Sequence, residues 1–208
     1  MRMVRSAEPH DFTSQRAFDD VLARTIAELP PARRDASVLH LARFETPLGS
    51  LLAGATGVGL VVLEFTDPER LDVQLRRLAR RLKVALQPGT TVASEQAGRE
   101  LEAYFAHGLR RFTVSLAPMG TPFQHDAWQL LRSIPYGQTV SYGEQARRIG
   151  RPRAVRAVAQ ANGANPITIV VPCHRVIGSD GTLTGYGGGL WRKRWLLAHE
   201  SAVSAASI

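Results

Sequence analysis

A stretch with helical spacing of apolar positions runs over residues 13–29. The apolar positions recur every three or four residues, at Phe18, Val21, Leu22, Ile26 and Leu29. This spacing predicts one buried face of an α-helix. Two prolines at positions 30 and 31 end the predicted helix, because proline lacks a backbone donor and clashes with the preceding turn. A polar linker follows, so we expect residues 1–37 to form an N-terminal helical extension.

Shorter apolar runs characterise residues 38–66. Three such runs are separated by the turn sequences TPLG and TGVG, and turns of this kind join neighbouring antiparallel strands. The pattern therefore predicts a small antiparallel sheet. Helical spacing returns at residues 68–83 and 94–106, which predicts two helices whose apolar faces cover the sheet. Together these elements form an expected sheet-and-helix domain over residues 38–118.

The second half of the chain begins with a helix-start signature. Thr121 suits the capping position, Pro122 the first helical position, and Gln124 completes a capping box. The apolar face of this helix comprises Phe123, Ala127, Leu130, Leu131 and Ile134. From here the pattern is mainly helical, so we expect a C-terminal domain over residues 119–208. The expected fold class is α/β, of the α+β kind, with a small N-terminal sheet domain and a helical C-terminal domain.

Two short helices separated by a turn come next. In SYGEQARRIG, Ser141 caps a helix, Glu144 completes a second capping box, and Gly150 ends the helix. Pro152 then opens the second helix, in RPRAVRAVAQANG. This is the layout of a helix-turn-helix, whose second helix contacts DNA. An ordinary helical hairpin fits the same pattern, so the layout alone does not decide between them.

The second of these helices has two different faces. By helical spacing its inward face comprises Val155, Val158 and Ala159. The outer face carries Arg151, Arg153, Arg156 and Gln160. Such a face contacts phosphates but has little to read base edges in the major groove, which favours electrostatic, minor-groove binding. A basic face in solvent is the alternative.

The overall charge strengthens the nucleic-acid interpretation. Of 208 residues, 26 are lysine or arginine and 18 are aspartate or glutamate, a formal net charge of +8. This surplus favours polyanionic partners through counterion release, with nucleic acid ahead of an anionic membrane. No apolar run approaches the roughly 20 residues of a membrane span, and the N-terminus has no apolar signal core. We therefore expect a cytoplasmic protein without a membrane partner.

The chain has a single cysteine, Cys173, in the sequence VVPCHRVIG. One cysteine makes neither an internal disulfide nor a cysteine-rich zinc site, and the six histidines show no metal-ligand spacing. We therefore expect no metal. The apolar run ITIVVP leads directly to the thiol and predicts that it is buried. A buried cysteine is most often a small apolar residue, but His174 and Arg175 beside it favour a reactive thiolate.

The C-terminal helix, in WRKRWLLAHE, carries its charges in an unusual order. Basic residues occupy the first turns and Glu200 lies near the end, the reverse of what the helix dipole favours. An inward Glu200 would orient an imidazole and complete a Cys-His-Glu arrangement, whereas a solvated terminal glutamate fits equally well. Upstream, GYGGG places Tyr186 among four glycines, where backbone can lie close against a flat ligand.

Two long segments carry a resemblance to a known family. Residues 121–166, from TPFQ to GANP, and residues 172–200, from PCHRVIG to LLAHE, resemble the O6-alkylguanine-DNA alkyltransferases, or methylated-DNA–protein-cysteine methyltransferases. A weaker resemblance, to the family's N-terminal sheet domain, covers residues 44–66. The resemblance to this family implies DNA repair by direct reversal, in which a methyl or other alkyl group passes from O6-alkylguanine to the protein's own cysteine. The transfer is stoichiometric and irreversible, and it uses no cofactor.

The resemblance also implies a mode of DNA binding. A helix-turn-helix enters the minor groove of alkylated double-stranded DNA and flips the damaged guanine out of the stack. By match to the family's motifs, Arg156 fills the vacated stack, and Tyr142 presses on the flanking phosphate and meets the flipped base. The rest of the expected DNA-binding set is Arg151, Arg153 and Gln160. We expect the protein to act as a monomer.

Catalytic roles are implied by the same resemblance. Cys173 is the alkyl acceptor, His174 withdraws its proton through a water, and Glu200 orients the imidazole. Asn165 ties the recognition helix to the active-site turn, and Tyr186 lines the pocket and donates towards the guanine oxygen.

The expected substrate pocket comprises Tyr142, Val176, Tyr186 and Gly187. By the same resemblance, backbone around Cys173 and Val176 is expected to accept hydrogen bonds from the guanine amino group. Gly187, Thr168 and Thr184 lie at the pocket rim, where members of the family differ. The preference among alkyl adducts therefore stays open, as do cooperativity on DNA and the role of residues 1–37.

Two other functions fit parts of the sequence. A DNA-binding regulator would sense alkylation or oxidation at Cys173 without repairing DNA. Bacterial adaptive-response regulators of this kind carry a cysteine-rich zinc module, and a chain with one cysteine cannot form such a module. A cysteine hydrolase would use Cys173, His174 and Glu200, although adjacent nucleophile and base contact each other poorly. Alkyl transfer is the function we expect.

Overall fold

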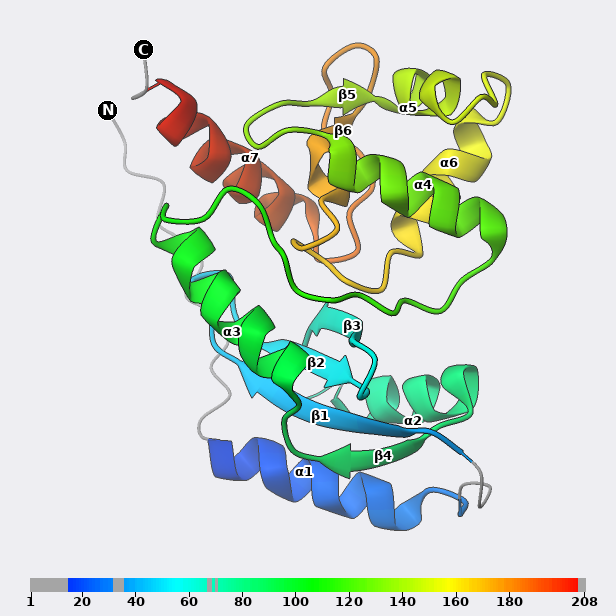
Figure 1. Ribbon diagram of the computed structural model, residues 1–208, viewed down its shortest axis with the longest axis vertical. Helices are drawn as coiled ribbons and strands as arrows, with labels where there is room; N and C mark the ends of the chain where they lie inside the picture. Colours follow the sequence, from blue (N-terminus) through cyan, green and yellow to red (C-terminus); the bar gives the residue numbers. More distant parts are fainter. Residues whose placement is uncertain (1–14, 32–35, 67–68, 70, 206–208) are drawn as a thin grey trace.

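The computed structural model describes residues 15–31, 36–66, 69 and 71–205 (Figure 1). Its N-terminal half is built around a four-stranded sheet with the order β3-β2-β1-β4. The strands are β1 (Val38–Phe44), β2 (Leu51–Ala55), β3 (Leu60–Phe65) and β4 (Ala85–Pro88). The first three form the predicted antiparallel meander, but β4 pairs in parallel with β1. The sheet is therefore mixed, not antiparallel throughout as predicted.

The sequence pattern missed β4 for a physical reason. The strand has only four residues, ALQP, and includes a proline, so it shows no alternation of apolar and polar positions. Proline is tolerated in this place because β4 is an edge strand, where a backbone donor is dispensable.

Helices cover both faces of the sheet (Figure 1). Helices α1 (Gln15–Glu28) and α2 (Leu71–Leu82) pack on one face, and α3 (Val92–Phe105) packs on the other, together with the C-terminal domain. Side chains of β2 alternate accordingly. Leu52 joins the core under α1 and α2, whereas Leu51 joins the core shared with the C-terminal domain.

Helix α1 lies within the predicted N-terminal extension. Its residues Phe18 and Leu22 are almost fully buried in the core that they share with α2 and the sheet. The helix therefore adds to the core of the N-terminal domain. Residues 1–14 and 32–35 of the predicted extension lie outside the described residues, and the domain boundaries at 37 and 118 stay predictions.

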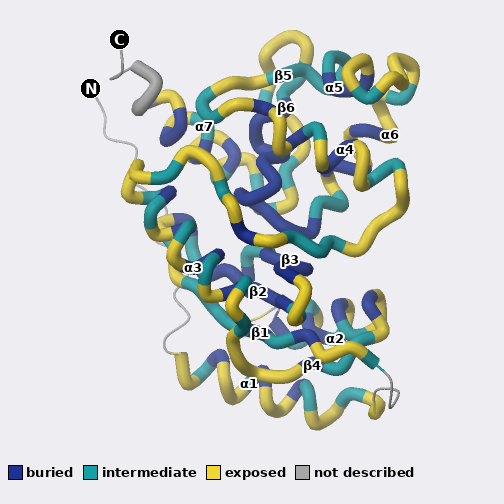
Figure 2. Tube along the Cα trace, viewed as in Figure 1, coloured by how far each residue is buried: buried dark blue, intermediate teal, exposed yellow. Residues whose placement is uncertain are grey.

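Strand β3 joins the two halves of the molecule. Leu63 donates its backbone amide to the carbonyl of Pro166 (2.7 Å) and accepts from the amide of Thr168 (2.8 Å). Residues 166–168 thus pair beside β3, which shields this edge of the sheet. Figure 2 shows β3 and the middle of the C-terminal domain as buried parts of the trace. The segment that leads to Cys173 is in this way fixed to the N-terminal domain.

The C-terminal domain is mainly helical, with one short parallel strand pair. Its elements are α4 (Pro122–Ser133), β5 (Val140–Ser141), α5 (Tyr142–Arg148), α6 (Val155–Gly163), the 3-10 turn η1 (Cys173–Arg175), β6 (Val176–Ile177) and α7 (Leu190–Ala205). The predicted capping box of α4 is confirmed, because Thr121 and Gln124 exchange hydrogen bonds. None of the helices within the described residues is long and apolar enough to cross a membrane.

The predicted apolar face of α4 was incomplete. Ala127, Leu131 and Ile134 are buried, but Phe123 and Leu130 are only partly buried. Trp128, which the pattern left out, is 3% exposed, and its indole donates to the carbonyl of Ala161 at 2.8 Å. This bond ties α4 to α6.

Helices α5 and α6 have the predicted helix, turn, helix layout. Ser141 caps α5 by accepting from the amide of Glu144. The second capping box is wrong, however, because the Glu144 carboxylate pairs with Arg147 and Arg148 instead. Gly150 follows α5 in the left-handed region, at φ 73°, as a helix-ending glycine does.

Helix α6 differs from the prediction in its start and its rotation. Pro152 lies in a turn, and the helix begins three residues later, at Val155. Its buried residues are Val158, Ala161 and Asn162, whereas Val155 and Ala159, which we expected to face inward, are exposed. Contacts from other helices fix this rotation. Asn162 exchanges two amide hydrogen bonds with Gln145 of α5, at 2.7 and 3.0 Å, and Ala161 accepts from Trp128.

Candidate active site

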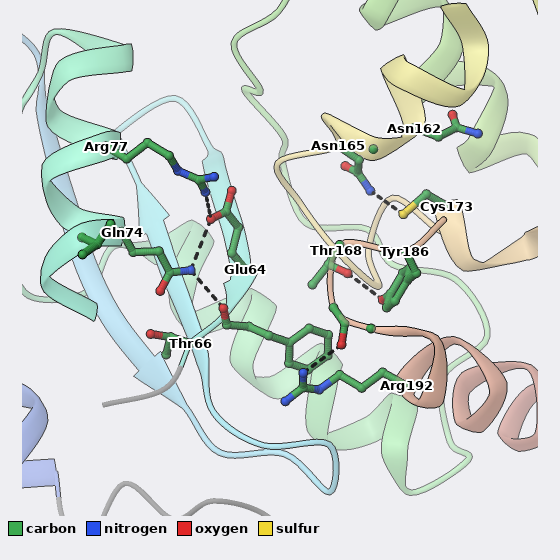
Figure 3. Close-up of a pocket in the computed structure, with 16 residues that line it drawn as sticks. Glu64, Thr66, Gln74, Arg77, Asn162, Asn165, Thr168, Cys173, Tyr186 and Arg192 are labelled. Carbon is green, nitrogen blue, oxygen red and sulfur yellow. Dashed lines mark hydrogen bonds and ion pairs between the residues drawn. The ribbon is translucent and has the colours of Figure 1, made fainter. Parts of the chain in front are cut away.

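Cys173 opens the turn η1 at the end of a buried apolar segment. Its side chain is 8% exposed and lines a cavity of about 770 Å³ between the two domains (Figure 3). The predicted burial of the thiol is therefore confirmed. The cavity also reaches the C-terminal end of α6 at Asn162 and Gly163, so this end of α6 borders the same cavity as the thiol.

Asn165 holds the thiol from the α6 side. Its amide nitrogen lies 3.3 Å from the Cys173 sulfur and donates to the Val171 carbonyl at 2.7 Å. Its side-chain oxygen accepts from the amide of Ile167 at 3.0 Å. Because Asn165 lies two residues after the end of α6, these bonds connect α6 to the turn that carries Cys173.

His174 and Glu200 form a buried pair. The imidazole Nε2 lies 2.9 Å from Glu200 Oε1, and both side chains are completely buried. Glu200 also accepts two hydrogen bonds from Arg175, one from the Tyr104 hydroxyl and one from the amide of Gly137. The glutamate near the end of α7 is thus a central buried acceptor and not a solvated helix end.

The protonation of this pair follows from its surroundings. Burial opposes ionisation of Glu200, but the bond from His174 and the Arg175 guanidinium outweigh it, so the pKa of this carboxyl is lowered. Burial also lowers the pKa of His174, in spite of its bond to Glu200. At neutral pH the imidazole is therefore neutral, and it donates from Nε2 to the carboxylate. Its Nδ1 is then an acceptor, and this buried atom has no hydrogen-bond partner in the part of the chain that the structure describes.

The thiol of Cys173 is not ionised by its surroundings alone. Burial raises its pKa, and the hydrogen bond from Asn165 and the charge of Lys193 oppose that rise only in part. The thiol is protonated at neutral pH and needs a base before it can attack a carbon.

Lys193 is a site residue that sequence reasoning missed. It is completely buried, and its ammonium donates to the carbonyls of Val176 and Thr184, both at 2.6 Å. It thereby joins β6 to the loop that carries Tyr186. A signal was present in the sequence, because Lys193, Leu196 and Glu200 recur at helical spacing on the face of α7 that is buried.

Of the predicted pocket residues, Tyr186 and Gly187 line the cavity, whereas Tyr142, at the start of α5, and Val176 are not among its lining residues. The hydroxyl of Tyr186 lies 2.7 Å from the hydroxyl of Thr168, and Tyr142 donates to the carbonyl of Thr184 at 3.1 Å. Gly187 lines the cavity, and the carbonyl of the fully buried Val176 accepts from Lys193. Burial raises the pKa of Tyr186, so its hydroxyl keeps its proton.

The predicted DNA-binding residues lie apart from the thiol, on the outer surface. Arg156 and Gln160 are exposed on α6, and Arg151 and Arg153 are exposed in the turn before it. The structure thus brings Cys173 together with the predicted catalytic residues and leaves the basic residues outside. No cluster of three or more metal-ligating side chains occurs among the residues described.

The sequence of this chain is similar to those of known proteins. The family model of the 6-O-methylguanine DNA methyltransferase DNA-binding domain matches residues 122–202. A methylated-DNA–protein-cysteine methyltransferase of Methanosarcina acetivorans is 44% identical over 168 residues, which are 79% of this chain and 99% of that protein. One of Mycobacterium bovis is 46% identical over 175 residues, covering 82% of this chain and 98% of that protein.

Solved structures agree with these sequence matches. The crystal structure of Mycobacterium tuberculosis OGT in complex with DNA is similar to this chain with a TM-score of 0.66 and 44% identity, over 78% of this chain and 93% of that one. Because the sequence and the fold agree over most of both chains, the protein belongs to the methylated-DNA–protein-cysteine methyltransferase family and repairs DNA by transferring an alkyl group to a cysteine, of which this chain has one, Cys173.

Proposed function

We propose that the protein takes O6-alkylguanine in duplex DNA as its substrate, binds the minor groove through α5 and α6, and flips the alkylated base into the cavity at Cys173. One observation carries this proposal. The Cys173 thiol and the Asn165 amide line a cavity that also reaches the end of α6, and the buried His174–Glu200 pair begins at the residue next to Cys173. Because the substrate is DNA, we expect the protein to act in the compartment that holds the genome. We also expect it to act as a monomer.

The residues around the cavity supply the chemistry of a single displacement. His174 Nδ1, through a water, takes the proton of the thiol, while Glu200 positions the ring. The sulfur then bonds to the alkyl carbon, and the bond from that carbon to the guanine O6 breaks. Its electron pair stays on the guanine oxygen, to which the Tyr186 hydroxyl donates a hydrogen bond, and the proton taken from the thiol returns to the guanine through the water at His174. Water does not cleave the thioether that forms, so each protein molecule reacts once and irreversibly.

Base flipping requires contacts from the exposed residues of α6, of the turn before it and of Tyr142. Unstacking a base costs a few kcal/mol, and least for a damaged pair. Arg156, exposed on α6, fills the space that the base leaves, and Tyr142 meets the flipped base beside the Tyr186 loop. Arg151, Arg153 and Gln160 hold the phosphates, which fix position but carry no sequence information.

The test compares Arg156→Ala on two substrates. We expect alkylation of Cys173 from an O6-methylguanine duplex to slow roughly 100-fold, because a few kcal/mol of flipping energy is lost. Reaction with free O6-methylguanine base should stay within about twofold of wild type. Arg24→Ala, which removes an exposed arginine from α1, is the control and should change neither rate. Equal losses on both substrates would show that Arg156 supports the pocket and not extrusion.

A further inference from the structure

A second cavity borders the segment that carries Cys173. Its volume is about 560 Å³, and it is lined by residues 110–112 after α3, by residues at the end of α4 and just after it, and by Val170, Pro172 and Arg175. It shares no lining residue with the cavity at Cys173. Figure 1 shows the connection from α3 to α4, which contributes residues 110–112, passing between the two halves of the molecule. The proposed function uses the first cavity and leaves the second without a role.

The second cavity is strongly basic. Four arginines line it, at positions 110, 111, 132 and 175, and none of its lining residues is acidic. The buried Arg175 is neutralised by Glu200. Arg111 and Arg132 are exposed, and neither forms an ion pair within the described part of the chain. A concave surface with charges of one sign concentrates ions of the opposite sign, so this cavity favours an anion.

Apolar and aromatic side chains form the rest of the cavity. Ile134 and Val170 are buried, whereas Phe112 and Tyr136 are partly exposed. Both of these rings pack against Tyr104 of α3, with ring centres 5.4 and 5.9 Å apart. Because Tyr104 is completely buried, it holds the two rings in place. A small anion such as phosphate would leave this apolar surface in contact with water.

The combination of arginines and aromatic rings restricts the chemistry of the ligand. A guanidinium is a planar fork of donors that matches phosphate oxygens, and a partly exposed aromatic ring stacks on a nucleobase. The volume is in the range of small-molecule sites. An acidic peptide would pair with the arginines, but without a flat ring it would leave Phe112 and Tyr136 uncovered. A ligand with a phosphate at one end and a base at the other matches both parts.

We propose that this second cavity is a nucleotide site, separate from the helix-turn-helix surface. The phosphate lies at Arg111 and Arg132, and the base lies against Phe112 and Tyr136. None of the predicted DNA-binding residues lines this cavity. A free nucleoside phosphate and a nucleotide within a single strand offer the same phosphate and ring. The site does not depend on alkyl transfer, so its failure would leave the proposed function untouched.

Binding of deoxyadenosine 5′-monophosphate tests the site, measured by isothermal titration calorimetry at low salt, where screening is weak. Two matched probes each lack one part of this nucleotide. Deoxyadenosine has no phosphate, and deoxyribose 5-phosphate has no base. We expect the nucleotide to bind about fivefold or more tightly than either probe, because the phosphate and the ring both contribute to binding.

Two variants locate the bound nucleotide. Arg111→Gln combined with Arg132→Gln should weaken its binding about tenfold or more, because charge-assisted hydrogen bonds are lost. Phe112→Leu should weaken binding of the nucleotide about fivefold and leave that of deoxyribose 5-phosphate unchanged. Arg24→Gln combined with Arg153→Gln is the control, because it removes the same charge at exposed positions outside the cavity. The control should keep the affinity of wild type, and thermal melts verify that each variant is folded.

Competition with a single-stranded oligodeoxyadenylate identifies the source of the nucleotide. Displacement of the bound monophosphate assigns the site to single-stranded nucleic acid, and no displacement assigns it to free nucleotides. Equal affinity for the nucleotide and deoxyribose 5-phosphate would show a site for anions in general and would overturn the proposal. Equal losses in the cavity variant and the control variant would overturn it as well.

Discussion

His174 Nε2 lies 2.9 Å from Glu200 Oε1, and neither side chain is exposed to solvent. This contact joins the turn that carries Cys173 to the last helix and leaves the other nitrogen of the imidazole, Nδ1, as the acceptor. It is also part of a larger buried network, because the same carboxylate neutralises Arg175 and accepts from Tyr104. The catalytic arrangement and the stability of the C-terminal domain therefore depend on one carboxylate.

Removing that charge should destabilise the fold. Glu200→Gln leaves the buried Arg175 guanidinium without its counter-ion, and breaking a buried pair in this way costs about 3–5 kcal/mol. Urea unfolding at neutral pH measures the loss. Glu102→Gln, an exposed change on α3, is the control and should cost less than about 0.5 kcal/mol. A loss for Glu200→Gln as small as that of the control would contradict the network.

The same pair predicts that acid weakens the fold. The pKa values of His174 and Glu200 are both lowered by folding, from ordinary values of 6.5 and 4.5, so the unfolded chain takes up protons that the folded chain does not. Stability is then complete above about pH 6.5 and falls as the pH decreases, first through His174 and below about 4.5 through Glu200. Urea unfolding over a pH series should show His174→Gln losing the upper part of this dependence. An unchanged dependence would show that His174 titrates alike in both states.

His174→Gln should slow alkyl transfer while it keeps the Glu200–Arg175 pair. The thiol of Cys173 loses its base, and general base catalysis contributes roughly 100-fold or more. Because burial raises the pKa of Cys173, the rate of the variant should recover only at high pH, where the thiolate forms unaided. Single-turnover rates across pH measure this, with a thermal melt to verify folding. A variant whose rate profile overlaps that of wild type would exclude His174 as the base.

Lys193→Met should also slow transfer, for a different reason. The variant loses the positive charge that opposes the effect of burial on Cys173, so the pKa of the thiol rises further. Each unit of that rise reduces the thiolate about tenfold at neutral pH. Iodoacetamide titration of the thiol measures the pKa directly. Lys83→Met, at an exposed lysine after α2, is the matched control, and equal pKa values in the two variants would contradict the assignment.

Most local signals in the sequence predicted local structure, although the Glu144 capping box and the helix start at Pro152 were wrong. The Thr121 capping box, the Gly150 helix end and the three-strand meander depend on neighbours within a few residues. The rotation of α6 was wrong because distant residues, Trp128 and Gln145, determine which of its faces is buried. The strand β4 was missed because its pairing partner precedes it by more than forty residues.

The site shows the same division. The position of Cys173 after an apolar run predicted its burial, and the reversed helix charges drew attention to Glu200. The contact of Glu200 with His174 was predicted, but its bonds from Tyr104 and Gly137 could not be, because both residues belong to segments far from it in sequence. The N-terminal domain also lines the cavity, with residues such as Glu64, Phe65 and Gln74, and this too results from packing between segments distant in sequence.

Transfer to Cys173 is the central claim, and intact mass tests it most directly. Wild type and Cys173→Ser are each incubated with excess O6-methylguanine duplex, weighed, and then digested to locate the added group. We predict that wild type gains one methyl group in place of one proton, on the peptide containing Cys173, and that longer incubation adds nothing. Cys173→Ser should bind the duplex and gain no mass. Repeated turnover by wild type, or a methyl group on any other residue, would contradict the account.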